Sequence, residues 1–281
     1  MQRRMVEINE RAGRTELGLV PGKMQGWPDS VRAIPNAILR SSLFGAIAPG
    51  DRLYVERQVV ATWGKVTIRY TRAQLDQSDL SVWMATLHIA RHHPTAKGHA
   101  CSASAYKLLQ LLGRTDSGKN RDILQRQLSR LSATSLEISF DAVAYEGSLI
   151  EEVYRDDETR AYVIQLNPRL HTLFQQDMTT WVNWGIRNQL TKQPLAQWLH
   201  SFYSTHKHPF DVKVETLHRM CGSEAVCMRG FTKSLRKALN AVSAATELHG
   251  AIFKWEINAG LLSVRRRQAP HQYNASHGVM K

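Results

Sequence analysis

The sequence has little cysteine and no long apolar segment. Its three cysteines, Cys101, Cys221 and Cys227, form an odd set without the spacing of a disulfide framework, which suits a reducing cytoplasm. No apolar run approaches the ~20 residues that a membrane helix needs. The opening MQRRMVEINERAGR has no apolar core after its arginines, so it is not a signal peptide. We therefore expect a cytoplasmic protein that does not span a membrane.

Acidic residues are also scarce relative to basic ones. The 281-residue chain has 24 Asp and Glu against 37 Lys and Arg, which gives a formal net charge of +13 and a pI near 9.9. Such a charge favours a polyanionic partner, with nucleic acid ahead of an anionic membrane surface. The length and the 43% hydrophobic content allow two domains.

The segment Arg229–Leu248 has the pattern of an amphipathic helix with one basic face. Its apolar residues recur at helical spacing, whereas its Lys, Arg and Asn residues fall at the opposite offsets. A short helix at Thr216–Cys221 precedes it, and strands are expected at Gly250–Ile257 and Leu261–Arg267. This order predicts a winged helix-turn-helix whose second helix could enter a major groove. The alternative is a solvated basic face on an ordinary helix.

A repeat predicts a second copy of the same domain. Residues 72–94 and 187–209 share Arg, Gln, Leu, Leu, Trp and Pro at one constant offset, 187 − 72 = 115. Both segments have the pattern of a helix that ends in a histidine-rich turn and a proline. Downstream, a second basic helix is expected at Asn120–Ser132, followed by a strand at Leu136–Phe140 that pairs with Ala161–Leu166. We therefore predict an α+β protein with two tandem winged-helix domains.

The expected domain boundaries follow from this repeat. They are a flexible arm at 1–26, a first winged helix at 27–178, a second at 179–267 and a loose tail at 268–281. Within the first domain, short helical segments are expected at Asp29–Pro35 and Ile38–Phe44, before strands at Arg52–Val60 and Gly64–Tyr70. Trp181 and Trp184 are expected at the domain junction.

The predicted DNA contacts lie on the two basic helices and on the second wing. Arginine suits guanine, asparagine and glutamine suit adenine, and lysine suits phosphate. The candidates are Lys119, Asn120, Arg121, Gln125, Arg126, Arg130, Arg229, Lys233, Arg236, Lys237, Asn240, Arg265, Arg266 and Arg267.

The first wing is expected to be acidic and therefore to point away from DNA or to contact a protein. Its acidic residues are Asp141, Glu146, Glu151, Glu152, Asp156, Asp157 and Glu158.

Three patterns suggest other chemistry, and none is complete. Gly113–Asn120 reads G-x-x-x-x-G-K, but Asn120 replaces the hydroxyl residue of a phosphate loop and the preceding segment is helical. His206-Lys207-His208 with Tyr203 resembles a nicking site, but the three residues follow a helix instead of lying on a buried strand. His218, Cys221 and Cys227 lack a fourth zinc ligand. We predict no catalytic site, no metal and no cofactor.

Four strings resemble the core of TrfA-type plasmid replication initiators. They are Trp27–Asn36, Arg40–Phe44, Leu128–Thr134 and Lys213–Ser223. The resemblance implies two winged helices that bind direct repeats (iterons) at a plasmid origin and open adjacent A·T-rich DNA. It also implies contacts with the host initiator and replicative helicase, and a monomer–dimer switch. Glu16–Val20 lacks the glutamine and the aromatic residue of the family's clamp-binding motif, so clamp binding is not expected.

Two other functions remain open at this point. A transcriptional repressor could be built from the same winged helices, and a rolling-circle nicking initiator would use Tyr203 as its nucleophile.

Overall fold

The structure is a computed structural model. It describes residues 27–267 except 49, 51, 65, 93, 96–97, 141–142, 157, 169–172 and 175–177. The predicted arm at 1–26, which includes Glu16–Val20, and the predicted tail at 268–281 lie outside these residues.

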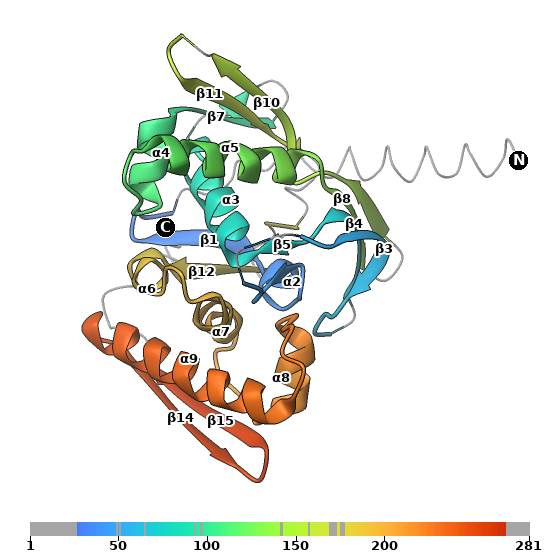
Figure 1. The fold of residues 1–281 in the computed structure, drawn as a ribbon, viewed down its shortest axis with the longest axis vertical. Helices are drawn as coiled ribbons and strands as arrows, with labels where there is room; N and C mark the ends of the chain where they lie inside the picture. The colour runs from blue at the N-terminus through green and yellow to red at the C-terminus, as the bar shows by residue number, and fades with distance from the viewer. Residues whose placement is uncertain are drawn as a thin grey trace, which may run out of the picture.

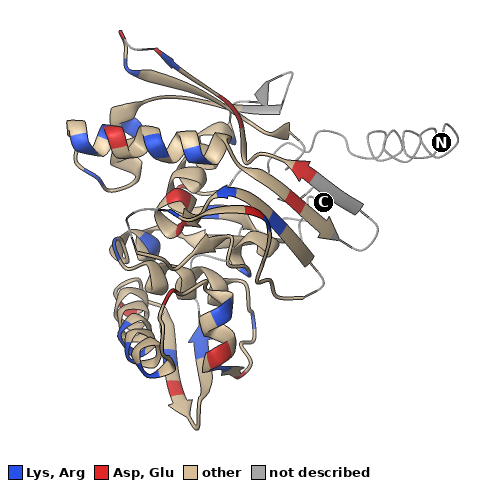
Figure 2. Cartoon of the chain, turned by 45° about the vertical axis from the view of Figure 1, so that its right-hand side comes forward, with Lys and Arg blue, Asp and Glu red and all other residues tan. Residues whose placement is uncertain are grey.

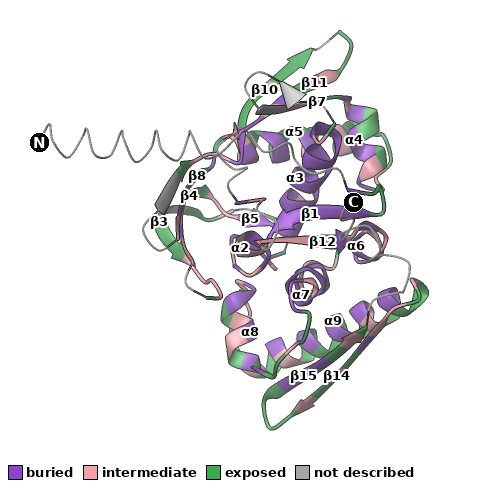
Figure 3. Ribbon diagram, turned by 180° about the vertical axis from the view of Figure 1, so that it is seen from behind, coloured by how far each residue is buried: buried purple, intermediate pink, exposed green. Residues whose placement is uncertain are grey.

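The first winged helix is built around α3 (Gln77–Ala90). Asp76 caps this helix: its carboxylate accepts hydrogen bonds from the backbone N–H groups of Ser78 and Asp79, and the Asp79 side chain accepts one from the Asp76 N–H. Every residue of α3 except Ser78 is buried, so the helix is covered on all sides (Figure 3). A helix that is buried on all sides shows no amphipathic pattern. The helix could therefore be predicted only from the internal repeat.

The rest of this unit has winged-helix connectivity. A sheet in the order β10-β11-β7-β6 flanks three helices. The elements are β6 (Pro94–Thr95), β7 (Gly98–Ser104), α4 (Ala105–Leu111), α5 (Gly118–Ser132), β10 (Ile150–Asp156) and β11 (Ala161–Leu166).

The second winged helix repeats this arrangement. Its sheet has the order β13-β15-β14, so in both units the strand before the second helix pairs with the last strand of the wing. The elements are α7 (Pro194–Ser204), β13 (Val212–Lys213), α8 (Val214–Met220), α9 (Met228–Leu248), β14 (Ile252–Asn258) and β15 (Leu261–Arg267). The predicted fold class, two tandem winged helices, is confirmed (Figure 1).

The predicted pairing of Leu136–Phe140 with Ala161–Leu166 in the first wing was wrong. The strand β8 (Ser135–Phe140) lies between β4 (Val66–Ala73) and β9 (Val143–Gly147), in a sheet of order β3-β4-β8-β9. The wing is the hairpin β10–β11. The expected strands at Arg52–Val60 and Gly64–Tyr70 are confirmed as β3 (Tyr54–Val60) and β4. Pairing across more than sixty residues depends on tertiary context, so local pattern could not assign it.

The expected helix before Pro35 was also wrong. Val31–Pro35 forms the strand β1, which pairs antiparallel with β12 (Thr179–Asn183). A single helical turn, α2 (Asn36–Leu39), follows, and β2 (Phe44–Gly45) pairs parallel with β5 (Leu75–Asp76). Pro35 is tolerated at the end of β1 because this sheet has only two strands, which leaves each strand with an unpaired edge.

Buried apolar side chains form two clusters. One runs in sequence from Trp27 to Trp184 and the other from Ile186 to Val264. Because β12 pairs with β1 and Trp184 belongs to the first cluster, we propose a domain boundary near residue 185, a few residues after the expected one. The pair β1–β12 lies between the two winged helices (Figure 1).

Candidate nucleic-acid interface

The helix α9 separates its two faces completely. Phe231, Leu235, Leu239 and Val242 are each 0% exposed and hold the helix on the second cluster. The five predicted contact residues of this helix are all exposed: Arg229, Lys233, Arg236, Lys237 and Asn240. The preceding turn begins at Gly222, whose φ of +62° suits glycine, and Cys227 caps the helix through a hydrogen bond from the Gly230 N–H to its Sγ. The result is an exposed basic surface over the first part of this 21-residue helix, from Arg229 to Asn240.

The second wing extends this basic surface, with one exception to the prediction. Arg265 and Arg267 are exposed, but Arg266 donates hydrogen bonds to the backbone carbonyls of Tyr203 and His206. The alternation of strand side chains explains the difference, because Arg266 shares the inward face of β15 with Leu262 and Val264. Arg266 therefore holds the wing on α7 instead of facing solvent.

The wing also contains a basic residue that the sequence analysis missed. Lys254 on β14 lies directly opposite Arg265, and both side chains are exposed. Like charges opposite one another destabilise a hairpin unless an anion lies between them. The register of the predicted hairpin could have revealed this residue, because it places Lys254 on the same face as Arg265.

Removing the positive charges of the second wing should change the salt dependence of DNA binding. Combined Lys254→Ala, Arg265→Ala and Arg267→Ala substitutions should lower the slope of log K against log salt by about 3, roughly 1 per lost phosphate contact. Affinity for all sequences should fall alike. Arg160→Ala, at the exposed turn of the first wing, is the matched control and should leave the slope unchanged. Equal slopes for the triple variant and the wild type would contradict the assignment.

The predicted contacts on α5 divide into two groups. Lys119, Gln125 and Arg126 are exposed, and Lys119 and Arg126 form no ion pair with another described residue. The other three are engaged within the protein. Arg121 binds Asp116 through two hydrogen bonds of 2.6 Å, and Asn120 donates to Thr115. Arg130 pairs with the carboxylate of Asp79 at 2.7 Å, and the Asp79 side chain is 0% exposed. Figure 2 shows Lys and Arg along both α5 and α9.

The acidic residues that were predicted for the first wing lie on two different hairpins. Glu151, Glu152 and Asp156 lie on β10 and are exposed, next to the turn that contains Glu158. Glu146 lies on β9, in the additional sheet, so its assignment to the wing was wrong. Asp141 and Asp157 lie outside the described residues. The true first wing is thus acidic, as predicted, and would repel phosphates.

The phosphate-loop pattern is a helix-turn-helix turn. Residues 112–117 connect α4 to α5, and Gly118–Asn120 form the first turn of α5, so the segment before the pattern is helical, as predicted. Ser117 caps α5, and Gly113 has a φ of +65°. Arg114 turns inward and donates to Gln127 and Ser78 at 2.7 Å. Its guanidinium therefore points into the protein instead of toward a ligand.

Tyr203 and the nearby histidines are also structural. The Tyr203 side chain is 2% exposed and packs against Phe202 and Phe253, so its hydroxyl is not accessible to a DNA phosphate. His206 is buried and contacts the Phe202 carbonyl. The imidazole of His218 contacts the Ala225 carbonyl at 3.0 Å, while Cys221 is buried in the second cluster. Among the described residues, no three His, Cys, Asp or Glu side chains form a metal-sized group.

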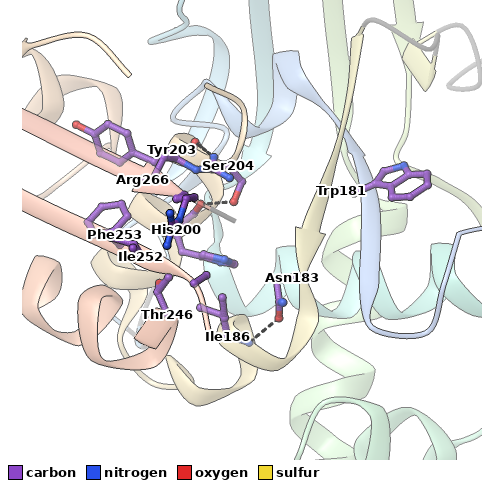
Figure 4. A pocket seen from close by; sticks show the side chains of 12 residues that line it. Trp181, Asn183, Ile186, His200, Tyr203, Ser204, Thr246, Ile252, Phe253 and Arg266 are labelled. Atoms are coloured by element: carbon purple, nitrogen blue, oxygen red, sulfur yellow. Dashed lines mark hydrogen bonds between the residues drawn. The ribbon is translucent and has the colours of Figure 1, made fainter. Parts of the chain in front are cut away.

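A small cavity lies where α7, α9 and the second wing meet (Figure 4). Its volume of about 50 Å³ has room for water but not for a nucleotide. His200 lines it, and the Nδ1 atom of His200 is buried without a hydrogen-bond partner among the described residues. Burial, together with Arg187 and Arg266, lowers the pKa of His200 to about 3. His200 is therefore neutral in the folded protein.

Acid should destabilise the protein through His200. The unfolded chain binds this proton near pH 6.5 and the folded chain only near pH 3, so stability falls as the pH decreases through that window. Between pH 7 and pH 5 the part of the loss that comes from His200 should be about 2 kcal/mol. His200→Gln should reduce the loss by that amount, whereas exposed His208→Gln should not. Urea unfolding at both pH values measures the difference, and equal losses for His200→Gln and the wild type would refute this origin.

The family model for the TrfA protein matches residues 12–262. The chain belongs to the TrfA family. It is 29% identical, over 223 residues, to the plasmid replication initiator protein TrfA of Escherichia coli. The match covers 75% of this chain and 56% of that relative, so the chain spans little more than half the length of the relative.

Two crystal structures of RctB are similar to this chain in fold. One, of domains 2 and 3, has a TM-score of 0.53 at 15% identity and covers 82% of this chain and 95% of that one. The second, of RctB residues 155–483, has a TM-score of 0.51 at 15% identity, over 79% and 94% of the two chains. At this identity the likeness concerns the fold alone.

The four strings that resemble the TrfA family lie partly in the core of the first unit, partly where the two units meet and partly on α5. Within the first unit, Trp27 donates its indole N–H to His88, and the Arg32 guanidinium lies 4.5 Å from the Trp184 ring centroid. The Ala46 N–H, next to the string at Arg40–Phe44, donates to the Cys221 carbonyl at 2.7 Å. The strings at Arg40–Phe44 and Lys213–Ser223 therefore contribute to the packing of one unit on the other, whereas Leu128–Thr134 belongs to α5 and the turn after it.

No helix among the described residues is long and apolar enough to cross a membrane.

Proposed function

We propose that this protein initiates plasmid DNA replication by binding direct repeats (iterons) at the origin through α9, the second wing and α5. The observation that carries the proposal is the exposed basic face of α9 beside Lys254 and Arg265, in a chain of the TrfA family. A relative in this family is itself a plasmid replication initiator. The protein would act by binding and deforming DNA, with no catalysis of its own.

The two units would read one repeat in succession. A winged helix places the second helix of its helix-turn-helix, here α5 and α9, in the major groove, so these two helices would occupy grooves about one helical turn, ~10 base pairs, apart. Because the two helices differ in sequence, the site that one copy reads need not be a palindrome. Lys119, Gln125 and Arg126 would contact the segment under α5, while Arg236 and Asn240 would read bases under α9.

Origin opening would follow from several copies bound side by side. Each copy bends the duplex, and the flexible A·T-rich steps deform first. Partners at this stage would be the exposed single strand, the host initiator and the replicative helicase. A monomer–dimer equilibrium would control the number of copies that can bind. Clamp binding is not part of this proposal.

Two experiments test the function. Footprinting on the DNA that flanks the gene should show a periodic array of protected repeats, with binding that weakens steeply as salt rises. The gene and its flanks should then maintain a replicon that lacks its own initiator, and Arg236→Ala with Asn240→Ala should abolish maintenance. Protected repeats without autonomous maintenance would favour a repressor, and a tyrosine-linked DNA adduct would favour a nicking enzyme.

A further inference from the structure

The junction between the two winged helices contains a fully buried arginine. Arg187, on the short helix α6 (Trp184–Gln189), is 0% exposed. Its guanidinium contacts α3 of the first unit and α7 of the second. These two helices are the counterparts of one another in the internal repeat, because Leu80 and Trp83 correspond to Leu195 and Trp198.

The hydrogen bonds divide between the two units. On α3, Nη2 donates to the Gln77 carbonyl at 2.7 Å, Nη1 to Gln77 Oε1 at 3.1 Å and Nε to Ser81 Oγ at 3.2 Å. On α7, Nη1 donates to Ser201 Oγ at 2.9 Å. Gln77 is itself fixed, since its Nε2 donates to the Phe44 carbonyl at 2.6 Å. The planar guanidinium thus makes directional hydrogen bonds to both helices at once, which constrain the distance and the rotation between α3 and α7.

This arginine is an expensive way to join two helices. Its hydrogen-bond acceptors are carbonyls, hydroxyls and an amide, and burial lowers its pKa to about 9. Apolar residues of similar volume often stabilise such a site as well or better, and buried polar groups are retained in some proteins because they specify one arrangement. An apolar contact between α3 and α7 would allow sliding, whereas directional hydrogen bonds do not.

We propose that Arg187 is a positioning residue that fixes the spacing and rotation of α5 relative to α9, and so the spacing of the two DNA segments that the protein reads together. The inference rests on the proposed function. The α3 contact reaches α5 directly, because Ser78 and Asp79 of α3 bind Gln127 and Arg130 of α5. On the other side, α7 packs against α9 in the second cluster. Arg187 therefore connects two rigid units, each of which includes one DNA-reading helix.

The DNA test uses duplexes that carry the footprinted repeat, either unchanged or with one base pair inserted between the two protected segments. An inserted base pair rotates one segment by roughly 35° relative to the other. The wild type should prefer the unchanged repeat by at least about tenfold. Arg187→Met should bind the unchanged repeat more weakly and prefer it by less than about threefold, because the units can then adjust to either spacing. A wild-type preference in Arg187→Met would overturn the proposal.

The matched control is Arg114→Met. Arg114 also hydrogen-bonds a serine of α3, Ser78, but its other partner, Gln127, lies in the same unit. It should therefore lower stability without changing the spacing preference. Should Arg187→Met fail to fold, Ser81→Ala with Ser201→Ala removes one acceptor on each side and keeps the arginine. This pair should reduce the preference in the same direction, and an unchanged preference would again overturn the proposal.

A DNA-free measurement separates this inference from the proposed function. Spin labels at exposed Ser129→Cys on α5 and Ala244→Cys on α9, with exposed Cys227→Ser, report the distance between the two helices in the full chain. Cys101 and Cys221 are buried and should not react. The distance distribution should be narrow with Arg187 or with Arg114→Met, and broad with Arg187→Met. A narrow distribution in Arg187→Met refutes the positioning role, whereas absence of specific DNA binding by the wild type refutes the proposed function.

Discussion

Arg130→Met should lower the free energy of unfolding by about 3–5 kcal/mol, because it removes one partner of a buried ion pair. The remaining partner, Asp79, is 0% exposed and belongs to the capping box of the buried helix α3. Burial and the neighbouring Asp76 already raise the pKa of Asp79, and Arg130 opposes that rise. Without Arg130, Asp79 must be either protonated or left as an uncompensated charge. Urea unfolding at neutral pH measures the loss.

The matched control is Arg126→Met on the same helix. Arg126 is exposed, forms no ion pair with another described residue, and should change stability by less than about 0.5 kcal/mol. In DNA binding the two variants should show the reverse order of effects. Arg126→Met should weaken binding to the repeat, whereas folded Arg130→Met should leave base preference intact. Equal stabilities would show that Asp79 finds another partner. A changed base preference for Arg130→Met would restore Arg130 as a reader.

Arg236→Ala combined with Asn240→Ala should weaken binding to the cognate repeat by about 2–6 kcal/mol, since each bidentate base contact contributes roughly 1–3 kcal/mol. Both side chains are exposed, one helical turn apart on α9. Removing them leaves the buried face of the helix untouched, so stability should not change. Binding to unrelated DNA should fall far less, because phosphate contacts dominate there. Competition with each singly substituted repeat identifies the base pairs that lose preference.

The control for this pair is Lys233→Ala with Lys237→Ala, also exposed on α9. Lysines that contact phosphates should weaken cognate and unrelated DNA by similar factors and lower the salt slope by about 2. Arg236 and Asn240 would not be base readers if the two double variants behaved alike.

The second winged helix could be predicted from sequence because its signals are local. The helix α9 has a clean apolar stripe, Gly222 ends the helix before it, and the strands of the hairpin that follows lie next to one another in sequence. The exposure of Arg229, Lys233, Arg236, Lys237 and Asn240 followed directly from the helical period. The internal repeat then gave the existence of the first unit, including α3, whose own pattern is uninformative.

Tertiary structure decided what pairs across the chain. The strand β8 pairs with β4, and β1 pairs with β12. Each pair joins strands that are far apart in the sequence, and the pattern of residues within a strand does not indicate which distant strand it will pair with. The candidate DNA-contact residues also depended on contacts between distant parts of the chain. Arg126 and Arg130 look alike in sequence, but only the fold brings a buried carboxylate to one of them. Arg187 was only the first matched position of the repeat segment 187–209, and the packing of α3 on α7 made it a buried arginine between the two units. Helical and strand periods tell which face of an element is buried, whereas the identity of the neighbour on that face depends on contacts between residues far apart in the chain.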